Sequence, residues 1–323
     1  MIADLFRARR RPALYSAHRA FRRRRVGVGQ TARMIPMRYD VLDVFTDAAF
    51  AGNPLAVVHG GVDLSSVQMQ AIAAEFGLSE TAFPLPPTTA EADYRLRIFT
   101  PARELPFAGH PSVGAAWLLA QKGLISTGDV VQECGAGLLP VHVDTHGAQV
   151  SGGAPVVGPV LDATALAAAV GLRAEDVEPG VQAGVAAAGV PYAVLPVRAG
   201  AVVRAGVPNA AALRALASDL VGVAVVSYDR AAWQAHMRMF APEAGVTEDP
   251  ATGSAAVALG VFLVDRGVLP ADGQSGFLVA QGVEVGRPSH LAVVVHAAGG
   301  VAQTTSVRGG VVAVARGELL ALP

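Results

Sequence analysis

The sequence LRIFTP at Leu96–Pro101 recurs as MRMFAP at Met237–Pro242, 141 residues further along this 323-residue chain. A second pair follows in the same order, because His110–Ala116 (HPSVGAA) matches Asp249–Ala255 (DPATGSA) after 139 residues. Two short motifs repeated in one order at nearly one spacing indicate an internal duplication. We therefore expect two similar lobes.

Each copy predicts a strand, a loop and a helix that begins at an Xaa-Pro pair. The first helix is expected from Pro111 to Lys122, with Gly123 as its stop. For the second, Asp249 is the expected N-cap and Gly267 the stop. Both helices are apolar nearly all round, so each must be covered on every side. The strand-like segments that would cover them are Tyr39–Phe45, Pro54–His59, Tyr94–Phe99, Val130–Cys134, Leu138–Val143, Val221–Ser227, His290–His296 and Val311–Ala315.

These elements predict an α+β fold of two similar lobes, each a curved mixed β-sheet wrapped around a central buried helix and related by a pseudo-dyad. The N-terminal lobe is expected at residues 37–155 and the C-terminal lobe at 156–323; whether the last strand returns to the first lobe is left open. A pseudo-dyad would bring the two helix beginnings face to face. Their free N–H groups attract anions, so the cleft suits a small molecule that carries a carboxylate.

The composition excludes several classes of protein. The chain is 52% hydrophobic and 16% charged, and its long apolar stretches are too short, or are broken by Pro191 and Pro196, to span a membrane. The single cysteine, Cys134, excludes an internal disulfide framework and any mechanism that needs two thiols. The eight histidines show no metal-ligand spacing, so no metal site is expected. We expect a soluble cytoplasmic protein.

The first 36 residues hold ten arginines and one acid, whereas the remaining chain carries ten more acids than bases. A basic N-terminal segment, the head, joined to an otherwise acidic chain does not predict a nucleic-acid-binding surface spread over the fold. The head could be a transit-type presequence, a basic arm for an acidic partner or an extension upstream of the real start. We favour the extension, and expect it to be disordered. Gly27–Ala32 loosely matches a dinucleotide fingerprint, but no strand precedes it and no helix pattern follows.

A further helix leads to the main candidate for chemistry. Ser65 and Gln68 have the spacing of a capping box, and Gly77 is the expected C-terminal stop. Glu80 follows just beyond the negative end of this helix, inside an otherwise apolar run. Both the helix dipole and desolvation disfavour a charged carboxylate there, so the pKa of Glu80 should rise toward neutrality. Such a carboxyl group suits proton transfer in both directions.

Several blocks of this sequence resemble the PhzF-like phenazine biosynthesis family. The resemblance runs from about Met37 to Leu322 and implies the fold that this family shares with diaminopimelate epimerase, with an active site between two lobes. It also implies a homodimer and a biosynthetic role. The blocks are Gly77–Phe83, Phe99–Pro101, Pro106–Pro111, Glu248–Ala255, Gln281–Gly282 and Gly286–Ser289.

The resemblance implies a cofactor-independent isomerase that moves a proton between carbons of a small carboxylate-containing metabolite. The implied catalytic residues are Glu80, His110 and Asp249, with Glu80 as the acid and base. Family members usually carry asparagine where this chain has Gly77, and a glycine serves the helix stop equally well. The implied substrate-binding residues are Ser79, Gly109, Gly253 and Ser254.

Alternative interpretations stay open at this point. Glu80 could be a surface carboxylate, His110 a structural residue and Asp249 an N-cap only. Cys134 is expected to be a strand thiol without chemistry. The alternative function is a two-lobed protein that binds or presents a small carboxylate without turning it over. Substrate identity and pathway cannot be read from these residues.

Overall fold

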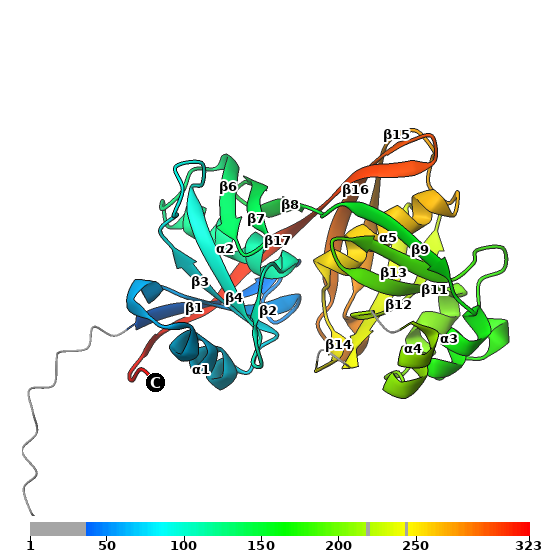
Figure 1. Cartoon of the computed structure of the whole chain (residues 1–323), viewed down its shortest axis with the longest axis horizontal. Coiled ribbons are helices and arrows are strands. Elements are labelled where there is room, and N and C mark those ends of the chain that lie inside the picture. The colour runs from blue at the N-terminus through cyan, green and yellow to red at the C-terminus, as the bar shows by residue number, and fades with distance from the viewer. Residues whose placement is uncertain (1–36, 218–219, 243–244) are drawn as a thin grey trace, which may run out of the picture. The chain divides into compact units, whose positions relative to one another are not determined.

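The structure is a computed structural model that describes residues 37–217, 220–242 and 245–323. The basic segment 1–36 lies outside the described residues. Figure 1 shows a strand-rich α+β fold with few helices, and the strands of the described residues join one hydrogen-bonded network of mixed parallel and antiparallel pairs. We name its two groups of elements after the helix that each surrounds.

The α2 group comes first in the chain. Its elements are β1 (Met37–Val44), β2 (Asn53–Val58), a 3-10 turn η1 (Gly61–Asp63), α1 (Ser66–Phe76), β3 (Glu80–Leu85), β4 (Tyr94–Phe99), β5 (Glu104–Leu105), α2 (Gly109–Gln121), β6 (Gly128–Cys134), β7 (Gly137–Val143) and β8 (Gly147–Ser151).

The α5 group follows. Its elements are β9 (Pro155–Val160), α3 (Ala163–Ala169), η2 (Ala174–Asp176), β10 (Gly184–Ala188), β11 (Pro191–Pro196), η3 (Ala199–Arg204), α4 (Ala210–Leu216), β12 (Gly222–Asp229), β13 (Gln234–Ala241), β14 (Val246–Asp249), α5 (Gly253–Asp265), β15 (Gly273–Gln281), η5 (Val283–Val285) and β16 (Ser289–Ala298).

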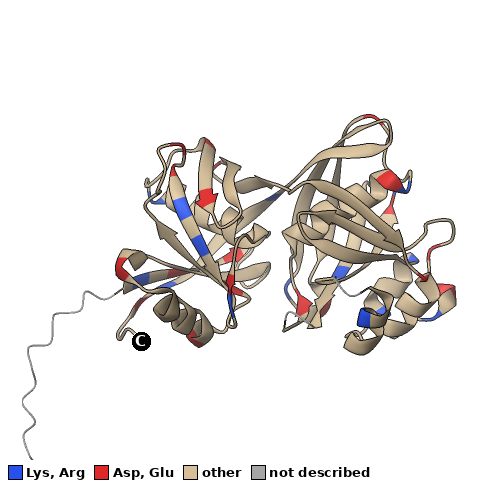
Figure 2. Cartoon of the chain, in the orientation of Figure 1, with Lys and Arg blue, Asp and Glu red and all other residues tan. Residues whose placement is uncertain are grey.

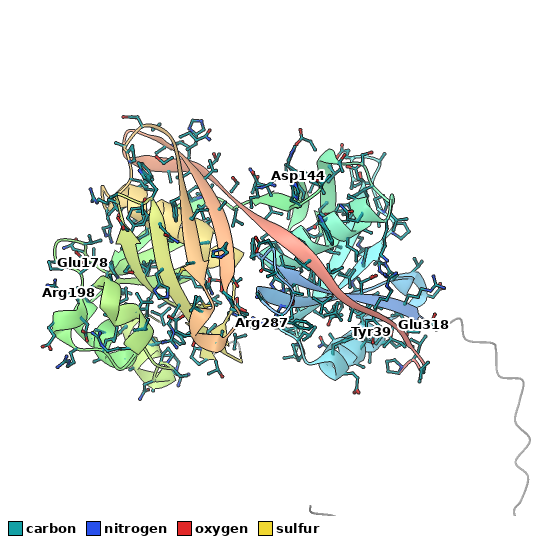
Figure 3. All side chains as sticks on the ribbon, turned by 180° about the vertical axis from the view of Figure 1, so that it is seen from behind. Tyr39, Asp144, Glu178, Arg198, Arg287 and Glu318 are labelled. Carbon is teal, nitrogen blue, oxygen red and sulfur yellow. The ribbon has the colours of Figure 1, made fainter. Side chains whose placement is uncertain are left out.

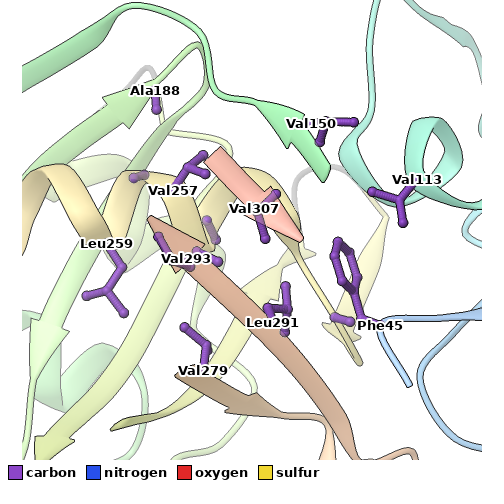
Figure 4. Close-up of a cluster of buried hydrophobic side chains, with 14 of the residues drawn as sticks. Phe45, Val113, Val150, Ala188, Val257, Leu259, Val279, Leu291, Val293 and Val307 are labelled. Atoms are coloured by element: carbon purple, nitrogen blue, oxygen red, sulfur yellow. The ribbon is translucent and has the colours of Figure 1, made fainter. Parts of the chain in front are cut away.

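The two apolar helices are covered by strands, as their sequences predicted. Helix α2 packs against β1, β2, β3, β4, β7, β8 and β17, and α5 against β9, β10, β11, β16 and β17. Figure 2 shows how few Asp, Glu, Lys and Arg residues lie on either helix, and Asp265 at the end of α5 is the one such residue between them. The buried core therefore surrounds both helices. In Figure 4, Val150 of β8, Val257 of α5 and Val307 of β17 contribute to one continuous cluster.

The last strand, β17 (Val301–Leu319), belongs to both groups. Its first half pairs with β16, its middle with β8 and its second half with β1. A Cβ atom added at Gly309 would overlap the ring of Phe45, so the crossing strand requires glycine there. Arg287 makes a second link, donating to the carbonyls of Ala51 and Gly52 at 2.7 Å each (Figure 3). It also pairs with the Asp43 carboxylate.

Both helix beginnings differ from the prediction. Helix α2 begins at Gly109, so that Pro111 lies inside its first turn. Helix α5 begins at Gly253 with Thr252 as its N-cap, and Asp249 lies instead at the end of β14. The prediction that Asp249 is the N-cap is therefore wrong. The physical reason is that Asp249 is held in the extended conformation by pairing with Met239 of β13.

The repeat is visible in the structure as two modules with one internal arrangement. The α2 module is β4, β5 and α2; the α5 module is β13, β14 and α5. In the first, Arg97 contacts the Phe99 ring at 5.1 Å and forms a two-bond pair with Glu104, at 2.7 and 2.6 Å. In the second, Arg238 contacts the Phe240 ring at 5.0 Å and pairs with Glu248 at 2.8 and 2.6 Å.

Strand register corrects the residue equivalence expected from the sequence. Ile98 of β4 pairs with Leu105, and its repeat counterpart Met239 pairs with Asp249. Asp249 therefore corresponds to Leu105, not to His110. The helix beginnings Gly109 and Gly253 are 144 residues apart, so His110 corresponds to Ser254.

Candidate active site

Glu80 lies just beyond the end of α1, as the local sequence predicted. Ser65 and Gln68 form the predicted capping box of α1, and Gly77 ends the helix in the left-handed conformation at φ 62°. Three residues later β3 begins at Glu80, between β2 on one side and β4 on the other. Ser79, next to it, is half-buried, and its role in binding stays a prediction.

Glu80 faces His110 inside the protein. Its Oε2 lies 3.4 Å from His110 Nε2, with side chains 16% and 6% exposed, so Glu80 is not a surface carboxylate. Burial, reinforced by the charge of Asp249, raises the pKa of Glu80 to about 8. Burial lowers the pKa of His110 to about 3, although a hydrogen bond to the Pro54 carbonyl opposes this. Near neutral pH both groups are therefore mostly uncharged.

Glu80 Oε2 and His110 Nε2, the two facing atoms, make no hydrogen bond that would stabilise the fold in the part of the chain that the structure describes. Neither Glu80 Oε2 nor His110 Nε2 has a hydrogen-bond partner among the described residues, and both atoms are buried. The 3.4 Å separation is long for a hydrogen bond. Unpartnered buried polar atoms are costly, and they occur where a ligand or a reaction makes use of them. This pair is thus the strongest candidate for chemistry in the described chain.

The Asp249 carboxylate accepts hydrogen bonds from both groups of elements. Asn53 Nδ2 donates to its Oδ1 at 2.9 Å, and Thr252 Oγ1 donates to its Oδ2 at 2.6 Å. Burial raises the pKa of Asp249 to about 6, while the two hydrogen bonds act in the opposite direction. Asn53 also donates to the Ala251 carbonyl at 2.9 Å. Because Asn53 begins β2, this contact fixes the α2 group against the α5 group beside Asp249.

The two helix beginnings meet beside these groups. A Cβ atom at Gly109 would lie 3.6 Å from Gly253 Cα and 3.8 Å from the Ser254 nitrogen, which are ordinary van der Waals distances, so the two helix beginnings lie next to each other. A cavity of about 270 Å³ adjoins them, lined by Gly109, Gly253 and Ser254 together with apolar side chains such as Phe107 and Val257. Glu80, His110 and Asp249 are not among its lining residues.

The cavity has a defined electrostatic character. It lies where the first turns of α2 and α5 leave backbone N–H groups without helical partners, which favours a negative group. Its lining contains no lysine or arginine. A ligand with one carboxylate and an apolar body matches that lining.

Sequence reasoning missed three polar residues of the site. Asn53 lies just before the strand predicted at Pro54–His59 and was not singled out, and neither was Tyr192 of β11. Gln281, completely buried, donates to the Asp249 carbonyl at 2.7 Å and accepts from the Thr252 N–H at 3.1 Å. The signal for Gln281 was present, since an uncharged amide at the end of an apolar strand needs buried partners.

Other predicted features can be placed briefly. Cys134 is half-buried at the end of β6, away from the Glu80–His110 pair in sequence and strand order. Within the described ranges, no three His, Cys, Asp or Glu side chains gather in a way that could hold a metal ion. No helix in those ranges has the length and apolar character needed to cross a membrane.

Comparison with known proteins gives a consistent result. Residues 42–317 match the PhzC-PhzF family model, described as phenazine biosynthesis-like protein. A Mesorhizobium japonicum protein named uncharacterized isomerase mll1393 is 38% identical over 87% of this chain and 98% of its own length. The trans-2,3-dihydro-3-hydroxyanthranilate isomerase of Pseudomonas aeruginosa is 34% identical over 87% of this chain and 98% of its own.

A solved structure agrees with these relatives. The crystal structure of a Bacillus anthracis phenazine biosynthesis protein of the PhzF family superimposes with a TM-score of 0.80 at 25% identity. The superposition covers 89% of this chain and 100% of the other. The α+β, strand-rich fold is therefore one that experimentally solved relatives also have.

Proposed function

Because the chain belongs to the phenazine biosynthesis-like family and is an isomerase, we propose that Glu80 carries out its proton transfer on a small carboxylate-containing substrate. The observation that carries this proposal is the Glu80–His110 pair. A buried carboxyl group with a pKa of about 8 lies 3.4 Å from an imidazole that is neutral, beside two helix beginnings. No cofactor is required for such a step.

In the proposed reaction, the Glu80 carboxylate removes a proton from one carbon of the substrate. The electron pair of the broken C–H bond shifts through the adjacent double bond, and the protonated Glu80 returns a proton to another carbon. With a pKa of about 8, roughly a tenth of the molecules hold the carboxylate at pH 7. The raised pKa also keeps the protonated form of Glu80 abundant near neutral pH, so one group can serve both half-steps.

His110 and Asp249 support that transfer from opposite sides. The Pro54 carbonyl can only accept, so we assign the ring proton of His110 to the nitrogen that faces Pro54. Nε2 is then free to accept from protonated Glu80 and to hold its orientation. Asp249, fixed by Asn53 and Thr252, would orient the substrate from the other side and help to stabilise the charge that develops on it.

The architecture of the site is part of the proposal. The matching α2 and α5 modules support two lobes, residues 37–155 and 156–323, related by a pseudo-dyad. The substrate carboxylate would bind at the paired helix beginnings, with Ser79, Gly109, Gly253 and Ser254 as binding residues. The apolar wall of the cavity would receive the hydrocarbon part.

The test compares the wild-type protein with Glu80→Gln in heavy water. The substrates are trans-2,3-dihydro-3-hydroxyanthranilate, for which relatives are named, and a panel of small unsaturated carboxylates. We expect Glu80→Gln to lose about 1000-fold in isomerisation and in carbon-bound deuterium, because its amide cannot accept a proton. Glu75→Gln is the matched control, since Glu75 is an exposed glutamate on α1.

Two results would contradict the proposal. Full turnover by Glu80→Gln would assign the proton transfer to another group. A wild-type protein that binds these carboxylates but exchanges no carbon-bound hydrogen would instead be a binding protein without turnover.

A further inference from the structure

Tyr192 is a buried hydroxyl group beside the candidate site that the proposed proton transfer does not use. It lies on β11, is 3% exposed, and its hydroxyl is 2.7 Å from Ser254 Oγ. Burial, together with the negative charges of Asp249 and Glu80, raises the pKa of the Tyr192 phenol. The phenol therefore stays protonated, close enough to both site carboxyl groups to sense their charge.

The burial of the two hydroxyl groups indicates which of them donates in the Tyr192–Ser254 hydrogen bond. A buried O–H donor that finds no acceptor is costly. Among the described residues, Ser254 Oγ is the hydrogen-bond partner of the Tyr192 hydroxyl. Either hydroxyl could donate at this distance, and we assign Tyr192 as the donor because its hydroxyl is the more deeply buried of the two. This assignment leaves the Ser254 hydroxyl proton free to donate elsewhere.

Ser254 has one open direction for that proton. It is the second residue of α5, half-buried, and it lines the 270 Å³ cavity together with Gly109 and Gly253. The backbone N–H groups of the first turn point toward the same region. A serine hydroxyl turned into the cavity adds one more donor where the lining offers no basic side chain.

We propose that Tyr192 is a positioning residue: it donates to Ser254 and thereby directs the Ser254 hydroxyl at the carboxylate of a ligand in the cavity. The inference rests on the proposed function only in taking this cavity as the carboxylate site. It does not depend on Glu80 as the proton carrier. The Tyr192–Ser254 pair should therefore favour a planar monocarboxylate over its neutral amide analogue.

The test is a binding experiment that needs no turnover. Benzoate and 3-hydroxyanthranilate are titrated by calorimetry into the wild-type protein, Tyr192→Phe, Ser254→Ala and the double variant, with benzamide as the neutral analogue. We expect each single variant to bind the two carboxylates about tenfold more weakly, a loss typical of one hydrogen bond to a charged group. The double variant should bind no more weakly than Ser254→Ala, because Tyr192 acts only through Ser254.

Controls separate this role from a structural one. Tyr228→Phe removes another buried phenol hydroxyl, which has no hydrogen-bond partner among the described residues, and should leave binding unchanged. Ser254→Thr keeps a hydroxyl at the same place and should retain affinity. Because the readout is binding and not turnover, a failed proton-transfer test leaves this result standing.

Four outcomes would overturn the inference. They are additive losses in the double variant, equal weakening for benzamide, unchanged carboxylate binding in Tyr192→Phe, and no binding of either carboxylate to the wild-type protein at millimolar concentration.

Discussion

The α2 and α5 modules share one scaffold but carry different chemistry. Each places an arginine over a phenylalanine ring and pairs it with a glutamate five residues before its helix. At equivalent positions, however, the first module has Leu105 and His110 where the second has Asp249 and Ser254. The scaffold repeats, whereas the side chains that we propose to be reactive do not. The proposed site would therefore be asymmetric, with the His110 imidazole on one side and the Asp249 carboxylate on the other.

The shared arginine–glutamate pairs also differ in their surroundings. The Arg97 and Glu104 side chains are 16% and 41% exposed, whereas those of Arg238 and Glu248 are 10% and 8% exposed. Arg238 further donates to the Val203 carbonyl and contacts that of Ala205. The pair next to Asp249 is therefore a buried structural element, and its counterpart lies at the surface.

Matched substitutions in the two arginine–glutamate pairs should give the largest difference between the modules, measured as lost stability. Arg238→Met leaves the Glu248 carboxylate buried without its partner, so we expect a loss of about 3–5 kcal/mol in the free energy of unfolding. Arg97→Met should lose about 1 kcal/mol or less, because water reaches Glu104. Urea denaturation of both variants measures the difference.

The double variant Arg238→Met/Glu248→Leu provides the control for that comparison. Removing both charges should recover much of the stability lost by Arg238→Met. Equal losses in the two single variants would show that burial does not distinguish the pairs.

The second prediction concerns the pH dependence of stability at Glu80. Its folded-state pKa of about 8 lies above the ordinary value of 4.5, so between those pH values the folded protein binds more protons than the unfolded chain. Stability due to this group is therefore lost as pH rises from 4.5 to 8. Glu80→Gln escapes that loss and should be more stable than wild type by about 4 kcal/mol at pH 8, with almost no gain at pH 4.5.

Denaturation at several pH values measures this difference between the two proteins. Contributions from Asp249 and His110 are common to both and largely cancel. Asp249→Asn should gain less, because the pKa of Asp249 rises only from 3.8 to about 6. Its carboxylate oxygens also accept two hydrogen bonds that the variant would disturb. A Glu80→Gln gain independent of pH would show that the carboxyl group is not perturbed by burial.

The third prediction removes the asymmetry itself. His110→Ser gives both helices the same second residue, and kcat/KM for isomerisation should fall about 100-fold because Glu80 loses its partner. Adding Ser254→His should not restore activity, since position 254 faces Tyr192 rather than Glu80. Steady-state rates measure this effect, with the substrate that the heavy-water experiment identifies. Restoration by the exchange would show that the two helix beginnings are interchangeable.

Local sequence patterns specified those parts of the fold whose partners are close in the chain. The capping box at Ser65 and the glycine stop at Gly77 were confirmed, because each depends on residues within one helical turn. The same kind of signal was present but unused at Asp162 and Asn209, which cap α3 and α4. The Asp249 N-cap prediction failed because strand pairing outweighed capping propensity there.

The candidate site shows a similar division. Glu80 and His110 were proposed to act together, and the structure places their facing atoms 3.4 Å apart. Asn53 and Tyr192 reach the site through contacts with residues 196 and 62 positions away, and nothing beside them in sequence signals that contact. Such long-range partners depend on strand order, which a single sequence does not specify.

The shared strand β17 also ties both groups of elements into one folding unit. Because the pairings with β1, β8 and β16 all lie on this one strand, neither group can complete its sheet before β17 has been synthesised. The edges of β1 and β8 that β17 covers would otherwise be free, and free strand edges are sites for unwanted strand addition. Strand β17 is therefore also the element that shields these two edges.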